Sequence, residues 1–168
     1  MESGVIAYKF MDRGQVSPFS RVRWPEPGEW LESDRVELCV TGVHACRTED
    51  LPYWLQRELW EVELDGDVIE GERLIVARRG RLVRRIEEWT EQVAGEFGAS
   101  CAAEARRRAD IAPGLADYAH DAEEAAERSP HFAAFAAARL AELQDGTAGY
   151  EAERERQARW LSARLGLG

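Results

Sequence analysis

The residue content of this chain changes near residue 84. Four of the six tryptophans and four of the six prolines precede that point, together with short runs in which apolar and polar residues alternate. After it, alanine, glutamate and arginine dominate, and apolar residues recur every three or four positions. Alternation is typical of strands, and the longer period is typical of amphipathic helices. We therefore predict an α+β protein, with a small, mostly antiparallel sheet domain over 1–84 and a helical region over 85–168.

Short alternating runs in the first part predict a series of strands. In the first of these, over 5–10, Tyr8 and Phe10 share one face and Lys9 lies on the other. Asp65-Gly66 predicts a hairpin between the strands at 58–64 and 67–69, because a two-residue primed turn needs positive φ. The remaining expected strands lie at 21–24, 29–31, 35–40, 43–46, 74–77 and 81–84, with a short helix at 51–55.

The second part predicts helices separated by breaking residues. The apolar residues Ile86, Trp89, Val93 and Phe97 follow a helical spacing. Proline and glycine pairs then interrupt the pattern. The expected helices cover 85–109, 115–128, 132–143 and 151–165.

The overall charge and the cysteine content limit the class of protein. With a formal net charge of −10, the chain repels phosphate backbones, so nucleic-acid binding is not expected. No apolar run approaches the roughly 18 residues that span a bilayer, and the first ten residues lack the features of a secretory signal. Together with the acidic charge, this predicts no membrane association. Three cysteines are an odd number, which favours reduced thiols and a cytoplasmic location.

The unusual side chains gather between residues 39 and 64. This window holds two of the three cysteines, one of the three histidines and two of the six tryptophans. His44 lies between small and apolar neighbours, and we weigh a hydrogen-bonded structural histidine equally against a polar or acid–base group of a ligand site. Aromatic walls with a few polar groups are typical of small-molecule pockets. The expected pocket residues besides His44 are Arg23, Trp24, Cys46, Tyr53 and Trp54.

Other interpretations of the same residues stay open. Cys39, His44 and Cys46 are all zinc-ligand types, although their spacing differs from the paired spacing of most structural zinc sites. The two cysteines are better explained as small buried apolar residues than as metal ligands, and Cys46 beside His44 could also act as a nucleophile. Glu61 and Glu63 could perform acid–base chemistry or be solvated on a strand face. The arginines of 78–85 could bind phosphate or pair with the chain's own acids.

Part of the sequence resembles a known group of proteins. Tyr8-Lys9-Phe10, Arg23-Trp24-Pro25 and the run from Cys39 to Cys46 resemble an uncharacterised family found in actinobacteria and phages. Its signature is Cys-x-x-Gly-x-His-Ala-Cys, and the resemblance extends from Ile6 to Trp89. It implies a domain over this range, but no particular chemistry. The alanine, arginine and glutamate content of the second half separately suggests a bacterial source.

A second resemblance concerns the segment from Gly42 to Cys46 and the short helix after it. This segment looks like the one that walls the nicotinamide pocket in ADP-ribosyltransferase-like folds. The resemblance implies NAD as the ligand, an approach by Tyr8 or Arg23 from an early strand, and a strand glutamate such as Glu61 as the catalytic acid.

Two functional hypotheses follow from these observations. The first is a cytoplasmic protein that binds a small molecule, a nucleotide or another acidic or phosphate-bearing ligand, and possesses enzyme activity if the pocket centred on His44 is ADP-ribosyltransferase-like. The second is a non-catalytic interaction module, in which the Cys/His cluster is structural or binds zinc and the C-terminal helices form a homodimer or partner surface.

Overall fold

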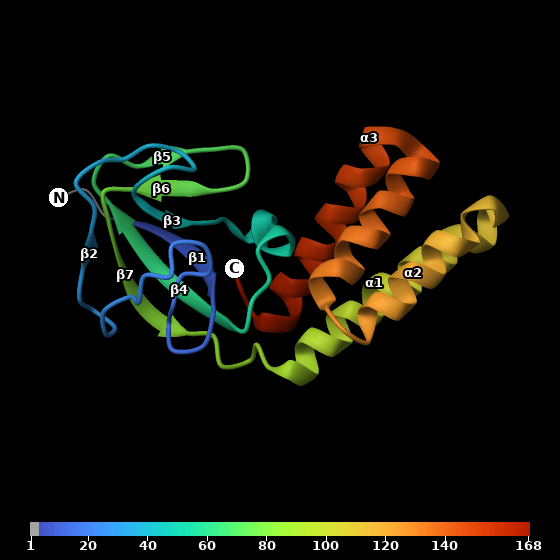
Figure 1. Ribbon diagram of the computed structural model, residues 1–168, viewed down its shortest axis with the longest axis horizontal. Helices are drawn as coiled ribbons and strands as arrows, with labels where there is room; N and C mark the ends of the chain where they lie inside the picture. Colours follow the sequence, from blue (N-terminus) through green and yellow to red (C-terminus); the bar gives the residue numbers. More distant parts are fainter. Residues whose placement is uncertain (1–3) are drawn as a thin grey trace. The chain divides into compact units, whose positions relative to one another are not determined.

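The computed structural model describes residues 4–168 and divides into two compact units, Met1–Trp89 and Thr90–Gly168 (Figure 1). The first unit is built of strands and the second of helices, which confirms the predicted α+β class. The division falls after Trp89, whereas the sequence pattern placed it after residue 84. Within 4–168, no helix combines the length and the apolar character that crossing a bilayer requires.

The strands of the first unit form two antiparallel sheets. One sheet has the order β1-β4-β7-β2 and the other the order β3-β6-β5. A 3₁₀ helix, η1 (Thr48–Tyr53), follows β3. The strands are β1 (Val5–Met11), β2 (Leu31–Glu32), β3 (Val43–Ala45), β4 (Glu58–Asp65), β5 (Ile69–Glu70), β6 (Ile75–Ala77) and β7 (Arg79–Arg85).

Apolar side chains from both sheets form one core. Ala7, Val62 and Leu82 contribute from the first sheet, and Val43 and Ile75 from the second, each almost fully buried. Both faces of β1 make apolar contacts. Ala7 lies on the core face, and Phe10 on the other face packs edge-on against Trp89, with the ring centres 5.3 Å apart. From Ala7 to Met11, both faces of β1 are therefore buried or half-buried.

The arginines of β7 pair with acids of β4. Arg81 forms an ion pair with Glu63 at 2.7 Å, and Arg84 forms one with Glu61 at 3.2 Å. Arg79 pairs with Asp65 one step further along the ladder. The basic cluster therefore meets the protein's own carboxylates, one of the two alternatives that the sequence left open.

Two local predictions are wrong for conformational reasons. The segment 35–40 alternates like a strand, but it forms a turn in which Cys39 has a φ of +63° and the Glu37 and Thr41 main chains bond to each other. A left-handed φ at Cys39 breaks the extended backbone that a regular strand needs. Asp65-Gly66 does not start a β4–β5 hairpin either. The chain leaves the first sheet there, with positive φ at Gly66 and Asp67, and β4 pairs with β7 instead.

The first helix begins later than its apolar spacing predicted. Ile86 N donates to Leu59 O at 2.8 Å and Trp89 Nε1 donates to Gln56 O at 2.9 Å, so this segment belongs to the β unit. Helix α1 (Glu91–Ile111) starts after Thr90, whose side chain accepts a hydrogen bond from Val93 N. A threonine at this position satisfies a free donor of the first turn.

The helical unit contains α1, α2 (Ala116–Ala126) and α3 (Pro130–Leu165), with a 3₁₀ turn η2 (Pro113–Leu115) between the first two. Gly146, with a φ of +70°, kinks α3, as the predicted break at Asp145-Gly146 implied. Gln157 Nε2 donates to Ala134 O at 2.9 Å, so the two parts of α3 lie side by side (Figure 1, orange and red). Buried alanines such as Ala105, Ala122 and Ala137 permit this close packing.

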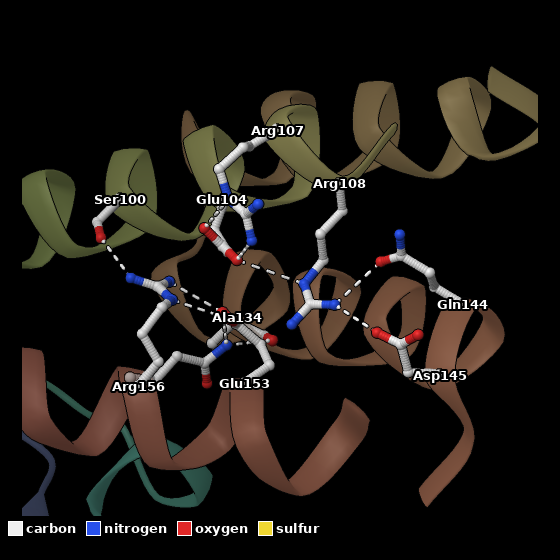
Figure 2. Close-up of polar contacts among 10 residues, drawn as sticks. Ser100, Glu104, Arg107, Arg108, Ala134, Gln144, Asp145, Glu153 and Arg156 are labelled. Carbon is white, nitrogen blue, oxygen red and sulfur yellow. Dashed lines mark hydrogen bonds and ion pairs between the residues drawn. The ribbon is translucent and has the colours of Figure 1, made fainter. Parts of the chain in front are cut away.

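A polar network lies between α1 and α3 (Figure 2). Glu153, which is 1% exposed, binds Arg156 at 2.9 Å, and Arg156 donates to Ser100 Oγ on α1 at 3.1 Å. Further along, Arg108 of α1 donates to Asp145 of α3 at 3.2 Å. These bonds satisfy a carboxylate that would be costly to bury alone.

Candidate functional site

A cavity of about 650 Å³ lies within the first unit. Its walls come from β1, β2, β3 and the loops at 17–24 and 39–42, with Trp54 and Leu74 completing the lining. The volume is in the range typical of small-molecule sites, and the lining is mainly apolar. This cavity is the candidate functional site.

The loop that forms one wall is held by a buried carboxylate. Glu58, at the start of β4, accepts hydrogen bonds from Gly14 N at 2.9 Å, Gln15 N at 3.1 Å and Trp60 Nε1 at 3.1 Å. Burial alone would raise the pKa of Glu58, but these bonds outweigh it and hold the pKa below its usual value. Gln15 Nε2 in turn donates to Trp24 O at 2.9 Å, which connects Glu58 to the cavity wall.

Aromatic side chains make up much of the wall and are fixed at their polar ends. Trp24 is 2% exposed and donates from Nε1 to Ser17 Oγ at 2.9 Å. Trp54 donates from Nε1 to Arg73 O at 2.8 Å and meets the Phe19 ring edge-on at 6.3 Å. Phe19 itself is 82% exposed, so the wall ends in an apolar side chain at the surface.

Lys9 is the cationic group of the cavity. Alternation along β1 places it on the same face as Ala7 and Met11, which belong to the core. Its Nζ donates to His44 O at 2.8 Å and lies 5.8 Å from the centre of the Trp24 ring. Within residues 4–168, no carboxylate forms an ion pair with it. Burial lowers the pKa of Lys9 to about 8, and only the weak influence of Cys46 opposes this.

Lys9 is also the single lysine of the chain. The other 21 basic residues that are charged at neutral pH are all arginines. Most of these arginines lie on the surface or in ion pairs, as on β7. Lysine loses its proton more easily than arginine. This residue type therefore occurs once in the chain, at a cavity wall.

His44 is a second polar group of the lining. Its Nδ1 lies 3.2 Å from Gly42 O, and because a carbonyl only accepts, Nδ1 carries the proton of the neutral ring. Nε2 is buried and has no hydrogen-bond partner in the described chain. Burial, followed by the positive charge of Lys9, lowers the pKa of His44. The imidazole is thus neutral at physiological pH and holds an unused acceptor.

The cysteines differ from one another in exposure. Cys46 is buried where its main chain pairs with Tyr8, and burial raises the pKa of its thiol to about 12. Such a thiol stays protonated, whereas a nucleophile needs the thiolate. Cys39 is exposed on its turn. Across residues 4–168, no three His, Cys, Asp or Glu side chains are grouped to hold a metal ion, so Cys39, His44 and Cys46 do not assemble a zinc site.

The structure brings five of the residues proposed for the site together, and places three elsewhere. Tyr8, Trp24, His44, Cys46 and Trp54 all line the cavity. Arg23 is exposed and pairs with Glu26 at 3.6 Å, outside the lining. Tyr53 packs under the Arg73 guanidinium at 4.2 Å. Glu61 of β4 forms an ion pair with Arg84 of β7.

Lys9 is the residue that the sequence interpretation missed. The alternation over 5–10 places Lys9 on the strand face opposite Tyr8 and Phe10 but suggests no role for it. The signal was present in the flanking residues, because Ala7 and Met11 are apolar at the same parity. A lysine between two apolar residues on one strand face indicates either a bulge or a buried amine.

Comparison with protein-family models, with curated proteins and with solved structures finds no significant match for this chain.

Proposed function

We propose that the first unit is a small-molecule-binding domain whose ligand combines an apolar or aromatic body with an acidic group. The observation that carries this proposal is the position of Lys9, a mostly buried ammonium without a carboxylate partner at the wall of a 650 Å³ cavity. Burying an unpaired charge costs free energy that an anionic ligand would recover. The lining supplies one carboxylate, Glu32, which lies exposed on β2.

The rest of the lining supports an apolar ligand body. Trp24, Trp54 and Phe19 offer ring faces and edges, and Val22 and Val40 are exposed beside them. Apolar side chains that remain exposed around a cavity are typical of ligand-binding surfaces. Aromatic carboxylic acids and acidic lipids of similar size fit this combination of charge and surface.

Calorimetric titration with an aromatic acid tests the proposal. We use 2-naphthoate as the probe, with 2-naphthylmethanol as its uncharged counterpart. We expect 2-naphthoate to bind with one site per chain and the alcohol to bind at least about tenfold more weakly, since the alcohol lacks the charge that Lys9 would neutralise. Equal affinity for both compounds would remove Lys9 from ligand recognition.

Two variants complete the test. Lys9→Met removes the ammonium and is expected to abolish the preference for the acid over the alcohol. Arg159→Met makes the same change in net charge on the surface of the helical unit, where Arg159 is 72% exposed. If Arg159→Met reduced 2-naphthoate binding as strongly as Lys9→Met does, the attraction would be a long-range effect of net charge and not recognition by Lys9.

A nucleotide such as NAD is the alternative ligand raised by the ADP-ribosyltransferase resemblance. His44 lines the cavity, but Glu61 is paired on β4 and does not line it, so the position of the expected catalytic acid gives this alternative no support. NAD is included in the same titration. Binding of NAD that is lost in His44→Ala and kept in Lys9→Met would favour the nucleotide.

The helical unit suggests a second candidate function, a surface for self-association. Phe132, Phe135 and Leu143 recur at helical spacing on α3 and are 64%, 50% and 43% exposed. An apolar stripe of this kind is typical of an interface between helices. Sedimentation equilibrium of the wild type and of Phe132→Ser/Phe135→Ser tests this role. A monomeric wild type at high concentration would exclude it.

A further inference from the structure

Recognition of an acid does not by itself require a lysine. Arginine binds carboxylates with two parallel hydrogen bonds and is the more common choice for this task. This chain uses arginine 21 times and lysine once, at the cavity. The property that lysine has and arginine lacks is a neutral, nucleophilic form that is accessible near physiological pH.

The surroundings of Lys9 favour that neutral form. Core residues Ala7 and Met11 flank it on β1, and its one hydrogen-bond acceptor in the described chain is the uncharged His44 carbonyl. With a pKa of about 8, roughly a tenth of the amine is neutral at pH 7. This fraction is about 300-fold larger than that of a solvent-exposed lysine. Amines activated in this way by an apolar pocket act as covalent nucleophiles in enzymes.

We propose that the Lys9 amine forms an imine with an aldehyde or ketone that carries an apolar or aromatic body and enters this cavity. In this step the Nζ lone pair forms a bond to the carbonyl carbon. The two hydrogens of the neutral amine leave with the carbonyl oxygen as one molecule of water, and a C=N double bond remains. The reaction needs no oxidant or reductant. The inference rests on the proposed function in one respect, that the cavity admits a small organic molecule.

The cavity also provides the conditions in which an imine persists. Water hydrolyses imines, and the largely apolar lining around Trp24 and Trp54 limits the amount of water near Nζ. An aromatic carbonyl compound would in addition conjugate with the imine and stack on these rings.

Reductive trapping tests the proposal directly. The protein is incubated at pH 7.5 with 2-naphthaldehyde and cyanoborohydride, and the products are followed by intact-mass and peptide mass spectrometry. In a sample that consists of residues 1–168, the single lysine makes the result easy to interpret, because the α-amine of that sample is its one other primary amine. Fragment ions separate the two sites within the peptide of residues 1–13.

The α-amine serves as an internal control, because its usual pKa of about 8 is close to that of Lys9. Similar pKa values predict labelling rates of the same order unless the cavity binds the aldehyde. We expect Lys9 to be labelled at least about tenfold faster than the α-amine, owing to the higher effective concentration of a bound aldehyde. We also expect excess 2-naphthoate to slow labelling of Lys9 and to leave the α-amine unaffected. Labelling of Lys9 at or below the rate of the α-amine would overturn the proposal.

Two further samples show whether a faster labelling of Lys9 than of the α-amine arises from the folded cavity. Lys9→Arg keeps the positive charge and cannot form an imine, so it should show labelling of the α-amine alone. Wild type unfolded in urea should lose the preference for Lys9, and a preference that persisted there would be a property of the peptide and would also overturn the proposal.

The outcomes separate this inference from the proposed function. Binding of 2-naphthoate without preferential labelling of Lys9 leaves acid recognition intact and rejects the imine. Preferential labelling without binding of the acid supports the imine and rejects acid recognition. The absence of both rejects the cavity as a ligand site for compounds of this class.

Discussion

The Nζ atom of Lys9 lies 5.8 Å from the centre of the Trp24 ring, so the single lysine of the chain and its most deeply buried tryptophan share one cavity wall. An ammonium near an aromatic face gains about 0.5–2 kcal/mol. Taking an unpaired ammonium out of water costs several kcal/mol. The interaction with Trp24 thus offsets a part of the cost, and the remainder lowers the stability of the fold.

Replacing Lys9 with methionine should therefore stabilise the protein at neutral pH. Lys9 has a folded pKa of about 8 and an ordinary pKa of 10.5, so the folded state binds fewer protons than the unfolded state between these values. The penalty from Lys9 is fully present below pH 8 and disappears as the pH rises to about 10.5. We expect Lys9→Met to be more stable by about 2–3 kcal/mol at pH 7 and nearly equal to wild type at pH 10.5.

The comparison is made by urea denaturation of both proteins across pH 7–10.5. Cys46 and His44 titrate close to Lys9, with the pKa of Cys46 raised and that of His44 lowered by burial first. Taking the difference between the variant and the wild type removes most of their contribution. A Lys9→Met protein that is less stable at pH 7, by an amount independent of pH, would show that Lys9 has a structural role.

The sequence was sufficient to predict those elements whose apolar pattern has a single interpretation. Alternation along β4 and the 3.6-residue period after Thr90 correspond to the strand and helices that form. The segment 35–40 has the same alternation as β4, but its partner strand is missing and Cys39 reverses the chain instead. Pattern alone does not tell whether a neighbouring strand is available, because pairing depends on residues distant in sequence.

Only the part of the candidate site that lies in one short sequence segment could be predicted. The signature around His44 directed attention to a segment that does line the cavity. Lys9 escaped notice because β1 is buried on both faces, and a single sequence does not reveal which face of such a strand meets a cavity. The anchoring by Glu58 joins residues more than 40 positions apart and leaves no local pattern.

Glu58→Gln should weaken the support of the cavity wall. A neutral amide has one acceptor oxygen, so it cannot satisfy the Gly14, Gln15 and Trp60 donors together. We expect a loss of about 2 kcal/mol in unfolding free energy at pH 7. Because the folded pKa of Glu58 is lowered, this stabilisation is present above its ordinary pKa of 4.5 and is lost as the pH falls through the folded value. Denaturation at pH 7 and pH 3 should show the difference between the two proteins shrinking in acid.

Gly42→Ala should destabilise the segment that carries His44. Gly42 has a φ of +120°, and a Cβ there would lie 2.5 Å from Cγ2 of Val76. We expect a loss of about 2–3 kcal/mol. The control is Gly95→Ala on α1, where a Cβ meets nothing within 4 Å and a gain of about 0.5–1 kcal/mol is expected. Thermal unfolding distinguishes the two, and equal effects would contradict the steric argument.

Phe19→Ser should affect ligand binding more than stability. Phe19 is 82% exposed and touches Trp54 at the cavity wall. Its replacement should change the unfolding free energy by less than about 0.5 kcal/mol. Affinity for 2-naphthoate should fall several-fold, as measured by calorimetry, because the ligand loses an apolar contact. Phe132→Ser, which removes an exposed ring from the helical unit, should leave this affinity unchanged.

Glu153→Gln should destabilise the helical unit. Glu153 is almost fully buried and accepts hydrogen bonds from Arg156 and Gln157 (Figure 2 shows the pair with Arg156). Removing its charge leaves the Arg156 guanidinium without its partner, at an expected cost of about 2–4 kcal/mol. Glu155→Gln, at a position that is 70% exposed, should change stability by less than about 0.5 kcal/mol. Circular dichroism during urea unfolding provides the comparison.

With its single lysine at a cavity wall, the protein presents a surface whose fixed positive charges are guanidinium groups. Acylating reagents, amine-directed crosslinkers and enzymes that acetylate or ubiquitylate ε-amines find no target among the arginines. Among the side chains, amine-directed chemistry is therefore confined to Lys9, so any modification of a side-chain amine reports directly on the cavity.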